Sequence, residues 1–322
     1  MSKWQQWVRQ PQSVWLRKAL FQIHLWSGIG IGIYVLLISV SGSILVYRNE
    51  LFTYFTAKPV IVEATGARKS EDELRTRAIL AYPGYGVNQY FESKKNPREA
   101  VEIWMEQTVG DGRVQRLFNP YTGEDLGNSV PAGIRLVSWM TELHLNLLKG
   151  DSGRIANAVG AVLWTLLGLT GCVVWWPGIQ NWRRSVALSF RVGWKRFNWD
   201  LHSAMGFWTS LFILMWGITG IYAALPAPFR AVVDYFDPPK DEFMGLRAGD
   251  RFLRTVSRVH FGTFMGRSAA SAPIKVIWCV VGLAPVVLFV TGVIMWWNRV
   301  LRKKSSGNPS PEGRGWPAKR AG

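Results

Sequence analysis

The chain has 322 residues, of which 48% are hydrophobic and 18 are tryptophan, and its formal net charge is +17 at pH 7. The apolar residues are concentrated in four runs that lack Asp, Glu, Lys and Arg over membrane-spanning length, which excludes an ordinary soluble protein. These runs are Ala19–Tyr47, Ile155–Trp182, Leu201–Phe229 and Val276–Asn298. The composition predicts a polytopic membrane protein with four transmembrane helices.

The positive charge is concentrated on one predicted side of the membrane. Residues 1–18, 183–200 and 299–322 together carry 16 Lys and Arg against 2 acidic residues, whereas the remaining loops are nearly balanced. Cytoplasmic loops of membrane proteins carry such an excess, so both termini are expected in the cytoplasm and the two longer loops outside. Binding to nucleic acid is disfavoured, because topology accounts for the charge.

In chain order the sequence divides into nine predicted segments. They are a cytoplasmic basic lead (1–18), a first transmembrane helix (19–47), an extracytoplasmic domain (48–135), a histidine-bearing helix with the second transmembrane helix (136–182), a cytoplasmic basic link (183–200), a third transmembrane helix (201–229), an outer loop with a second histidine-bearing helix (230–275), a fourth transmembrane helix (276–298) and a disordered cytoplasmic tail (299–322).

The extracytoplasmic domain is predicted to be a small α+β unit. Ser70 to Tyr82 has the pattern of a helix, in which Ser70 and Glu73 form a capping box. Three extended stretches follow, with a Gly-Asp-Gly turn before the last of them. These stretches are 87–92, 100–107 and 114–118.

Three residues are expected to shape the ends of the membrane helices. Pro177 should end the second helix, Asp200 is a candidate N-cap of the third, and Pro285 should kink the fourth. The second outer loop is too short for a domain like the first, and its helical stretch is expected at 251–265.

The sequence contains a twofold internal repeat that includes all four histidines of the chain. His24 and His202 are each followed four residues later by glycine, and eighteen residues later by another glycine preceded by a hydroxyl residue. The matched positions are Gly28 with Gly206, Ser41-Gly42 with Thr219-Gly220, and Thr170-Gly171 with Thr291-Gly292. His144 and His260 are each followed six residues later by glycine.

The fold class predicted is therefore an all-α polytopic membrane protein whose four helices form two tandem halves, with a small extracytoplasmic α+β domain.

The predicted depths sort the histidines into an inner pair, His24 with His202, and an outer pair, His144 with His260. Ionisable groups in membrane helices are costly and commonly functional, although a single interfacial histidine can also be merely tolerated. Two facing imidazoles suit the axial positions of haem iron, whereas a zinc site prefers three or four converging ligands and a proton relay usually includes Asp or Glu. We therefore favour two b-type haems, held non-covalently because no C-x-x-C-H motif occurs.

Other residues are candidates for haem contacts. Gly28 and Gly206 could leave space for a flat macrocycle, or could equally be helix-packing glycines. Cations could pair with haem carboxylates, or could reflect topology and solvated surface. The candidates are Arg17, Lys18, Lys195 and Arg196 inside, and Arg254 and Arg258 outside.

The sequence resembles the PepSY-associated transmembrane family, iron-regulated inner-membrane proteins that include ferrioxamine-type di-haem siderophore reductases. The resemblance covers roughly residues 15–300. It is carried by LFQIHLWSGIGIG, NPYTGEDLG, ELHLNLLKG, TGCVVWWPG, NWDLHSAMGFW and TGVIMWW. It implies a PepSY-like outer domain, a bacterial inner-membrane location and haem ligation by His24, His144, His202 and His260.

The resemblance also implies a function: an oxidoreductase that takes electrons from the cytoplasmic side or the quinone pool and reduces a periplasmic ferric chelate, such as a ferric siderophore. The short second outer loop departs from the family pattern, so a substrate pocket would have to come from the first outer domain and the helices. Two alternatives remain open. One is a regulatory or binding protein anchored in the membrane without redox activity, and the other is a haem electron carrier for a different periplasmic acceptor.

Overall fold

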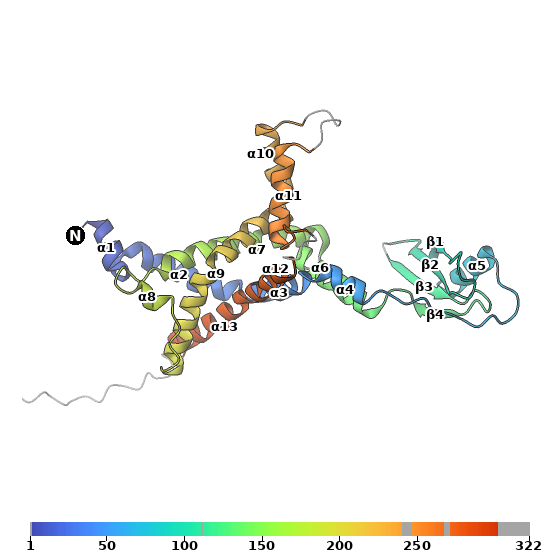
Figure 1. The fold of residues 1–322 in the computed structure, drawn as a ribbon, viewed down its shortest axis with the longest axis horizontal. Coiled ribbons are helices and arrows are strands. Elements are labelled where there is room, and N and C mark those ends of the chain that lie inside the picture. Colours follow the sequence, from blue (N-terminus) through green and yellow to red (C-terminus); the bar gives the residue numbers. More distant parts are fainter. Residues whose placement is uncertain (1, 111, 240–245, 267–270, 302–322) are drawn as a thin grey trace, which may run out of the picture. The chain divides into compact units, whose positions relative to one another are not determined.

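A computed structural model of the chain describes residues 2–110, 112–239, 246–266 and 271–301 (Figure 1). The fold is mostly helical with one small antiparallel sheet, and it divides into two compact units. The first comprises Met1–Val46 with Leu143–Gly322, and the second comprises Tyr47–Glu142. The expected disordered tail beyond residue 301 lies outside the described residues.

The first unit is a bundle of helices. Its long members are α2 (Trp15–Gly30), α3 (Gly32–Leu45), α7 (Gly150–Trp175), α9 (Trp194–Ala224), α12 (Ser271–Gly282) and α13 (Ala284–Trp296). Helix α7 packs against α9 and α2, and α13 packs against α9 and α3. Shorter elements complete the unit: α1 (Lys3–Arg9), the 3₁₀ turn η1 (Pro11–Ser13), α8 (Trp182–Ser185), α10 (Pro226–Phe236), α11 (Ala248–His260) and the π-helical turn η3 (Trp297–Leu301).

Among the described residues, three helices are long and apolar enough to cross a bilayer, namely α7, α9 and the run Ser271–Val300. Helices α2 and α3 together pass the same test but meet at a bend of 63°, so they supply a fourth span if the bent pair is counted as one. Many of the apolar side chains on these helices are exposed, as expected for helices that face lipid.

The first predicted transmembrane helix is interrupted at Ile31, which the sequence analysis did not anticipate. Ile31 lies between Gly30 and Gly32, and glycine favours a continuous helix less than any residue except proline. Gly32 is also buried, and a Cβ atom built on it would lie 1.8 Å from the ring of Phe289 in α13. The bend therefore occurs where the chain passes α13 too closely for a side chain.

The predicted start of the third membrane helix was wrong. Helix α9 begins at Trp194, with Gly193 as its N-cap, so Asp200 lies inside the helix. The side chain of Asp200 is buried and pairs with Arg196 one turn earlier, at 2.9 Å. A buried carboxylate needs a partner, and the salt bridge explains an acidic residue that looked like a cap in the sequence.

The prolines behave largely as expected. Helix α7 ends at Trp175, shortly before Pro177. Helix α12 ends at Gly282, and Pro285 lies in the first turn of α13, where its missing N–H is not needed. The second outer loop contains a helix that the sequence analysis missed, α10, which begins at Pro226, and the predicted helix at 251–265 forms as α11 (Ala248–His260).

The second unit contains the sheet. Helix α4 (Arg48–Tyr54) precedes α5 (Glu71–Ala81), and strands β1 (Tyr85–Phe91), β2 (Val101–Gln107), β3 (Arg113–Phe118) and β4 (Asp125–Asn128) form an antiparallel sheet in the order β1-β2-β3-β4. The capping box of Ser70 and Glu73 is confirmed. The strand β4 was not predicted, since it is short and includes glycine. Helix α6 (Ala132–Asn146) follows the sheet.

One face of this sheet packs on α5 to form the core. Alternate residues of β2, Val101, Ile103 and Met105, are fully buried together with Leu74 and Ala78 of α5. This is the alternation expected for a sheet with one covered face. It accounts for the compactness of the second unit.

Candidate functional site

The two inner histidines line one large cavity in the helical bundle. His24 lies on α2 and His202 on α9, and the cavity between these helices, α7 and α13 has a volume of about 1130 Å³. Pockets for small organic ligands usually measure ~300–1,000 Å³. The space therefore suits a large ligand, and it is lined mainly by apolar residues and glycines.

The Nδ1 atom of each inner imidazole lies within hydrogen-bond distance of a threonine hydroxyl of the neighbouring helix. The Nδ1 atom of His24 lies 3.2 Å from Oγ1 of Thr170 and 3.2 Å from the carbonyl oxygen of Leu167, both in α7. The Nδ1 atom of His202 lies 2.8 Å from Oγ1 of Thr291 in α13.

The rings of the two outer histidines lie close together, and each also has its Nδ1 atom next to a helix hydroxyl. The rings of His144 in α6 and His260 in α11 have their centres 6.4 Å apart. Nδ1 of His144 lies 3.0 Å from Oγ of Ser41 in α3, and Nδ1 of His260 lies 2.7 Å from Oγ1 of Thr219 in α9.

These contacts favour one tautomer of each imidazole. Each of the four hydroxyl oxygens also lies 2.6–2.9 Å from the carbonyl oxygen of the residue four positions earlier in its helix, to which it can donate its proton. With the proton placed there, the oxygen accepts from the imidazole, and Nδ1–H is the donor. The Nε2 lone pair is left free, which is the arrangement that second-shell partners give to metal-binding histidines.

The spacing of the outer rings fits two ligands on opposite sides of one metal ion. Metal–imidazole bonds of ~2.0–2.1 Å put the centres of two such rings about 6.3 Å apart. The observed separation of 6.4 Å agrees with this value. Among the described residues no group of three or more His, Cys, Asp and Glu side chains converges as in a protein-only metal site.

The two glycines near the inner pair have room for a side chain. A Cβ atom built on Gly28 or Gly206 would have its nearest neighbour at 3.6 or 3.8 Å, which is ordinary contact, and both residues line the cavity. By contrast, a Cβ on Gly160 would lie 2.3 Å from the ring of Tyr34. Gly28 and Gly206 thus widen the cavity next to the histidines.

Basic residues and unpaired donors gather around one end of this cavity. The basic residues that line it are Arg17, Arg184, Lys195, Arg196 and Arg299, whereas Lys18 is not among the lining residues. Arg17 donates from Nη2 to the carbonyl of Val174 at 2.6 Å, but its Nε is buried without a partner. The indole N–H of Trp175, which also lines the cavity, is buried and has no partner among the described residues, and the same holds for the N–H of Trp296, which occupies the matched position of the repeat but is not a lining residue. Such donors fit the carboxylates of a bound ligand.

The predicted outer cations lie elsewhere. Arg254 and Arg258 are exposed on α11, and residues two apart on a helix, such as Arg258 and His260, do not share a face. Their assignment to a haem carboxylate stays a prediction.

The sequence analysis identified Ser41, Thr170, Thr219 and Thr291 as repeat positions but assigned them no role. The signal was present, since each half of the repeat has two hydroxyl-glycine pairs at matched positions, as many as it has histidines. Which hydroxyl meets which histidine depends on helix packing, because Ser41 and His144 are 103 residues apart.

Comparison with known proteins identifies the family of this membrane protein. The model of the PepSY-associated TM region matches residues 21–242 and 237–299. No curated protein matches the chain significantly. Because the family match includes most of the sequence and all four histidines, the chain belongs to the PepSY-associated transmembrane family.

Proposed function

We propose that this protein is a di-haem transmembrane oxidoreductase that transfers electrons one at a time to a ferric chelate of the siderophore class outside the cytoplasmic membrane. The observation that supports this most strongly is the common state of the four histidines. Each has its Nδ1 atom 2.7–3.2 Å from a helix hydroxyl oxygen, which leaves the Nε2 atom available as a metal ligand.

The proposal assigns two spans to each half of a tandem repeat, and counts the bent pair α2–α3 as one span. In this arrangement each histidine is supported from within its own half, since His24 contacts α7 and His202 contacts α13. Each metal position would then lie between the halves. With both termini in the cytoplasm, the inner pair lies nearer the electron donor and the outer pair nearer the acceptor.

The residues present fit a b-type haem at the inner level. His24 and His202 would hold the haem iron, Gly28 and Gly206 would leave space beside them, and Arg17, Lys195 and Arg196 would supply positive charge for the haem carboxylates. His144 and His260 would provide the corresponding ligands at the outer level. A haem with two histidine ligands supplies a one-electron iron couple without an open coordination position.

The protein's own residues would orient the imidazole rings and keep water away from the electron-transfer path. The hydroxyl contacts prevent the imidazoles from rotating, and the apolar helix faces around the cavity exclude water from the path. The ferric chelate would be the substrate: its iron accepts one electron and becomes ferrous, and the complex then loosens because the chelating ligands prefer ferric iron.

The experiment is an anaerobic re-oxidation assay. Purified protein reduced with dithionite and freed of excess reductant is mixed with a ferric hydroxamate siderophore, and ferrous iron is trapped with ferrozine. We expect about two ferrous ions per chain, in step with loss of the reduced haem bands.

The alternatives give different outcomes. Reduced bands that persist with ferric chelates but disappear with a quinone or another acceptor would indicate an electron carrier for a different partner. A protein without haem bands would indicate a membrane-anchored binding or regulatory protein.

A further inference from the structure

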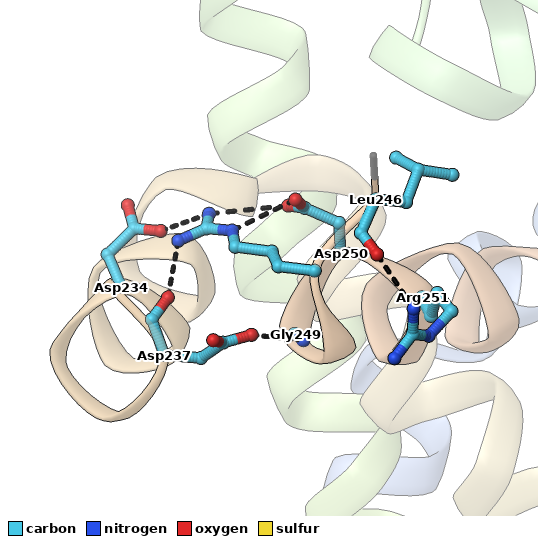
Figure 2. A network of polar contacts seen from close by, with 7 residues as sticks. Asp234, Asp237, Leu246, Gly249, Asp250 and Arg251 are labelled. Carbon is cyan, nitrogen blue, oxygen red and sulfur yellow. Dashed lines mark hydrogen bonds and ion pairs between the residues drawn. The ribbon is translucent and has the colours of Figure 1, made fainter. Parts of the chain in front are cut away.

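Two helices outside the spans form a hairpin of their own. Only Leu225 separates the end of α9 from α10, and α11 returns antiparallel to α10. Arg247, before α11, joins the two helices: it pairs with Asp234 of α10, and with Asp250 at 2.9 Å, and donates to the carbonyl of Asp237 at 2.5 Å (Figure 2). The carboxylate of Asp237 accepts from the Gly249 N–H at 2.7 Å. The hairpin is therefore a fixed unit.

Helix α10 carries an exposed apolar stripe. Ala231, Val232, Tyr235 and Phe236 are separated by helical spacing, and the exposed fractions are 58% for Val232 and 79% for both Tyr235 and Phe236. The opposite face of α10 supplies Asp234 and Asp237 to the contacts with α11. The aromatic residues consequently point away from the partner helix.

Helix α11 carries an exposed stripe of arginines. Arg251, Arg254 and Arg258 follow each other at three and four residues and are all exposed. Arg251 donates to the carbonyl of Leu246 at 2.7 Å. Within the described ranges no carboxylate forms an ion pair with Arg254 or Arg258. The hairpin thus presents large apolar side chains and cationic groups on neighbouring helices.

We propose that this hairpin lies on the outer surface of the membrane, with the apolar stripe of α10 in the acyl region and the arginines of α11 on the phosphates of anionic phospholipids. A helix with an apolar face and a cationic polar face binds the interface of a bilayer in this way. The inference does not depend on haem binding.

Two further observations favour lipid over a protein partner. The hairpin begins directly at the end of the membrane-spanning helix α9, so it is anchored next to the interface. It also projects to the side of the long bundle helices instead of continuing along them (Figure 1). Arginine stems can lie along apolar surface while their guanidinium groups reach the head groups.

Spin labels test the depth of the hairpin in nanodiscs that contain phosphatidylglycerol and phosphatidylcholine. Cys172 and Cys279 are replaced by alanine, and cysteines are introduced at Val232 or Tyr235. Leu211, exposed in the middle of α9, is the lipid reference, and Lys95, exposed in the sheet unit, is the water reference. We expect the ratio of oxygen to nickel-chelate accessibility at both test positions to exceed that at Lys95 several-fold and to approach that at Leu211.

Two results of this experiment would overturn the proposal. A ratio equal to that of Lys95 would place α10 in water. Protection from both oxygen and the nickel chelate would show that protein, such as a second copy of the chain, covers the stripe.

The second measurement is the lipid retained by detergent-purified protein. The variant R254Q/R258Q should lower the retained ratio of phosphatidylglycerol to phosphatidylcholine about twofold. The matched variant K94Q/K95Q removes the same charge from the sheet unit and should leave the ratio unchanged. Equal loss in both variants would contradict a specific role of the α11 arginines.

Discussion

Each histidine side chain in this protein contacts a helix hydroxyl through Nδ1. Because the hydroxyl also lies within hydrogen-bond distance of a carbonyl of its own helix, donation from Nδ1–H to the hydroxyl is favoured, and Nε2 remains available to bind a metal. The hydroxyls are therefore positioning residues in the proposed function.

Replacing Thr291 by valine tests this role at His202. Valine keeps the shape of threonine but removes the acceptor, so the imidazole becomes a weaker and less oriented ligand. We expect ~10–100-fold weaker haem retention and a higher midpoint potential for the remaining inner haem. Potentiometric titration measures this, with Thr291→Ser as the control that keeps the hydroxyl. Equal behaviour of the valine and serine variants would contradict the positioning role.

Gly42 and Gly220 directly follow the hydroxyl residues that contact the outer histidines, and alanine is expected to have a different effect at each of them. A Cβ on Gly42 would lie 2.8 Å from Cε1 of His144, whereas a Cβ on Gly220 would lie 3.9 Å from Cε1 of His260. Gly42→Ala should therefore displace the His144 ring and remove or perturb the outer haem, and Gly220→Ala should be tolerated. Electron paramagnetic resonance of the low-spin haems distinguishes the two variants. The idea fails if both variants leave the spectrum unchanged.

These residue-scale features could be predicted only in part. Repeat spacing drew attention to all four histidines, because matched positions in a sequence are visible without a structure. The partner of each histidine could not be predicted, since the contact of His202 with Thr291 depends on how α9 packs against α13.

At the scale of helices, α2 and α9 each present a glycine to the cavity. Because their Cβ positions are free of close contacts, alanine at Gly28 and Gly206 should leave the folding of the apoprotein unchanged. The added methyl groups should nevertheless exclude a macrocycle from the cavity. Thermal unfolding of haem-depleted protein and haem content of protein from haem-replete cells measure the two effects. A destabilised apoprotein would show that these glycines serve helix packing instead.

The sheet unit contains an ion pair that makes its stability depend on pH. Burial acts to raise the pKa of Asp125, but hydrogen bonds from Arg116, Tyr82 and the Gly127 N–H outweigh it, so the pKa is lower than the ordinary value. Folding therefore favours the charged carboxylate. The contribution of Asp125 to stability is complete above the unfolded pKa of ~3.9 and is lost as pH falls through the lower folded pKa.

Digestion with pepsin at pH values from 5 to 2.5 checks this dependence. Wild-type protein should resist cleavage between residues 48 and 135 better than Asp125→Asn at pH 5. The difference should disappear as the pH approaches the folded pKa. A difference that is constant over this range would show that the carboxylate charge does not stabilise the sheet unit.

The elements themselves were predicted to different degrees. Apolar runs located the membrane helices, and the Ser70–Glu73 capping box located α5. The two additional turns at the start of α9 were missed, because a burial-dependent ion pair between Arg196 and Asp200 stabilises them. The bend at Ile31 was also missed, since it reflects the approach of Phe289 to Gly32.

At the scale of the whole molecule, the chain is a multi-pass membrane protein of the PepSY-associated family with a separate compact sheet unit. The proposal gives the two units different tasks, because all four histidines and the large cavity belong to the helical unit. Electron transfer would then require the bundle, and the sheet unit would serve contacts outside the membrane.

The most direct test is the visible spectrum and pyridine haemochrome count of detergent-purified protein, for wild type and for the pair variants H24A/H202A and H144A/H260A. We predict about two b-type haems per wild-type chain, with low-spin bands typical of two histidine ligands, and loss of one haem in each pair variant. A colourless wild-type protein from haem-replete cells, or a haem count that neither pair variant changes, would contradict the account.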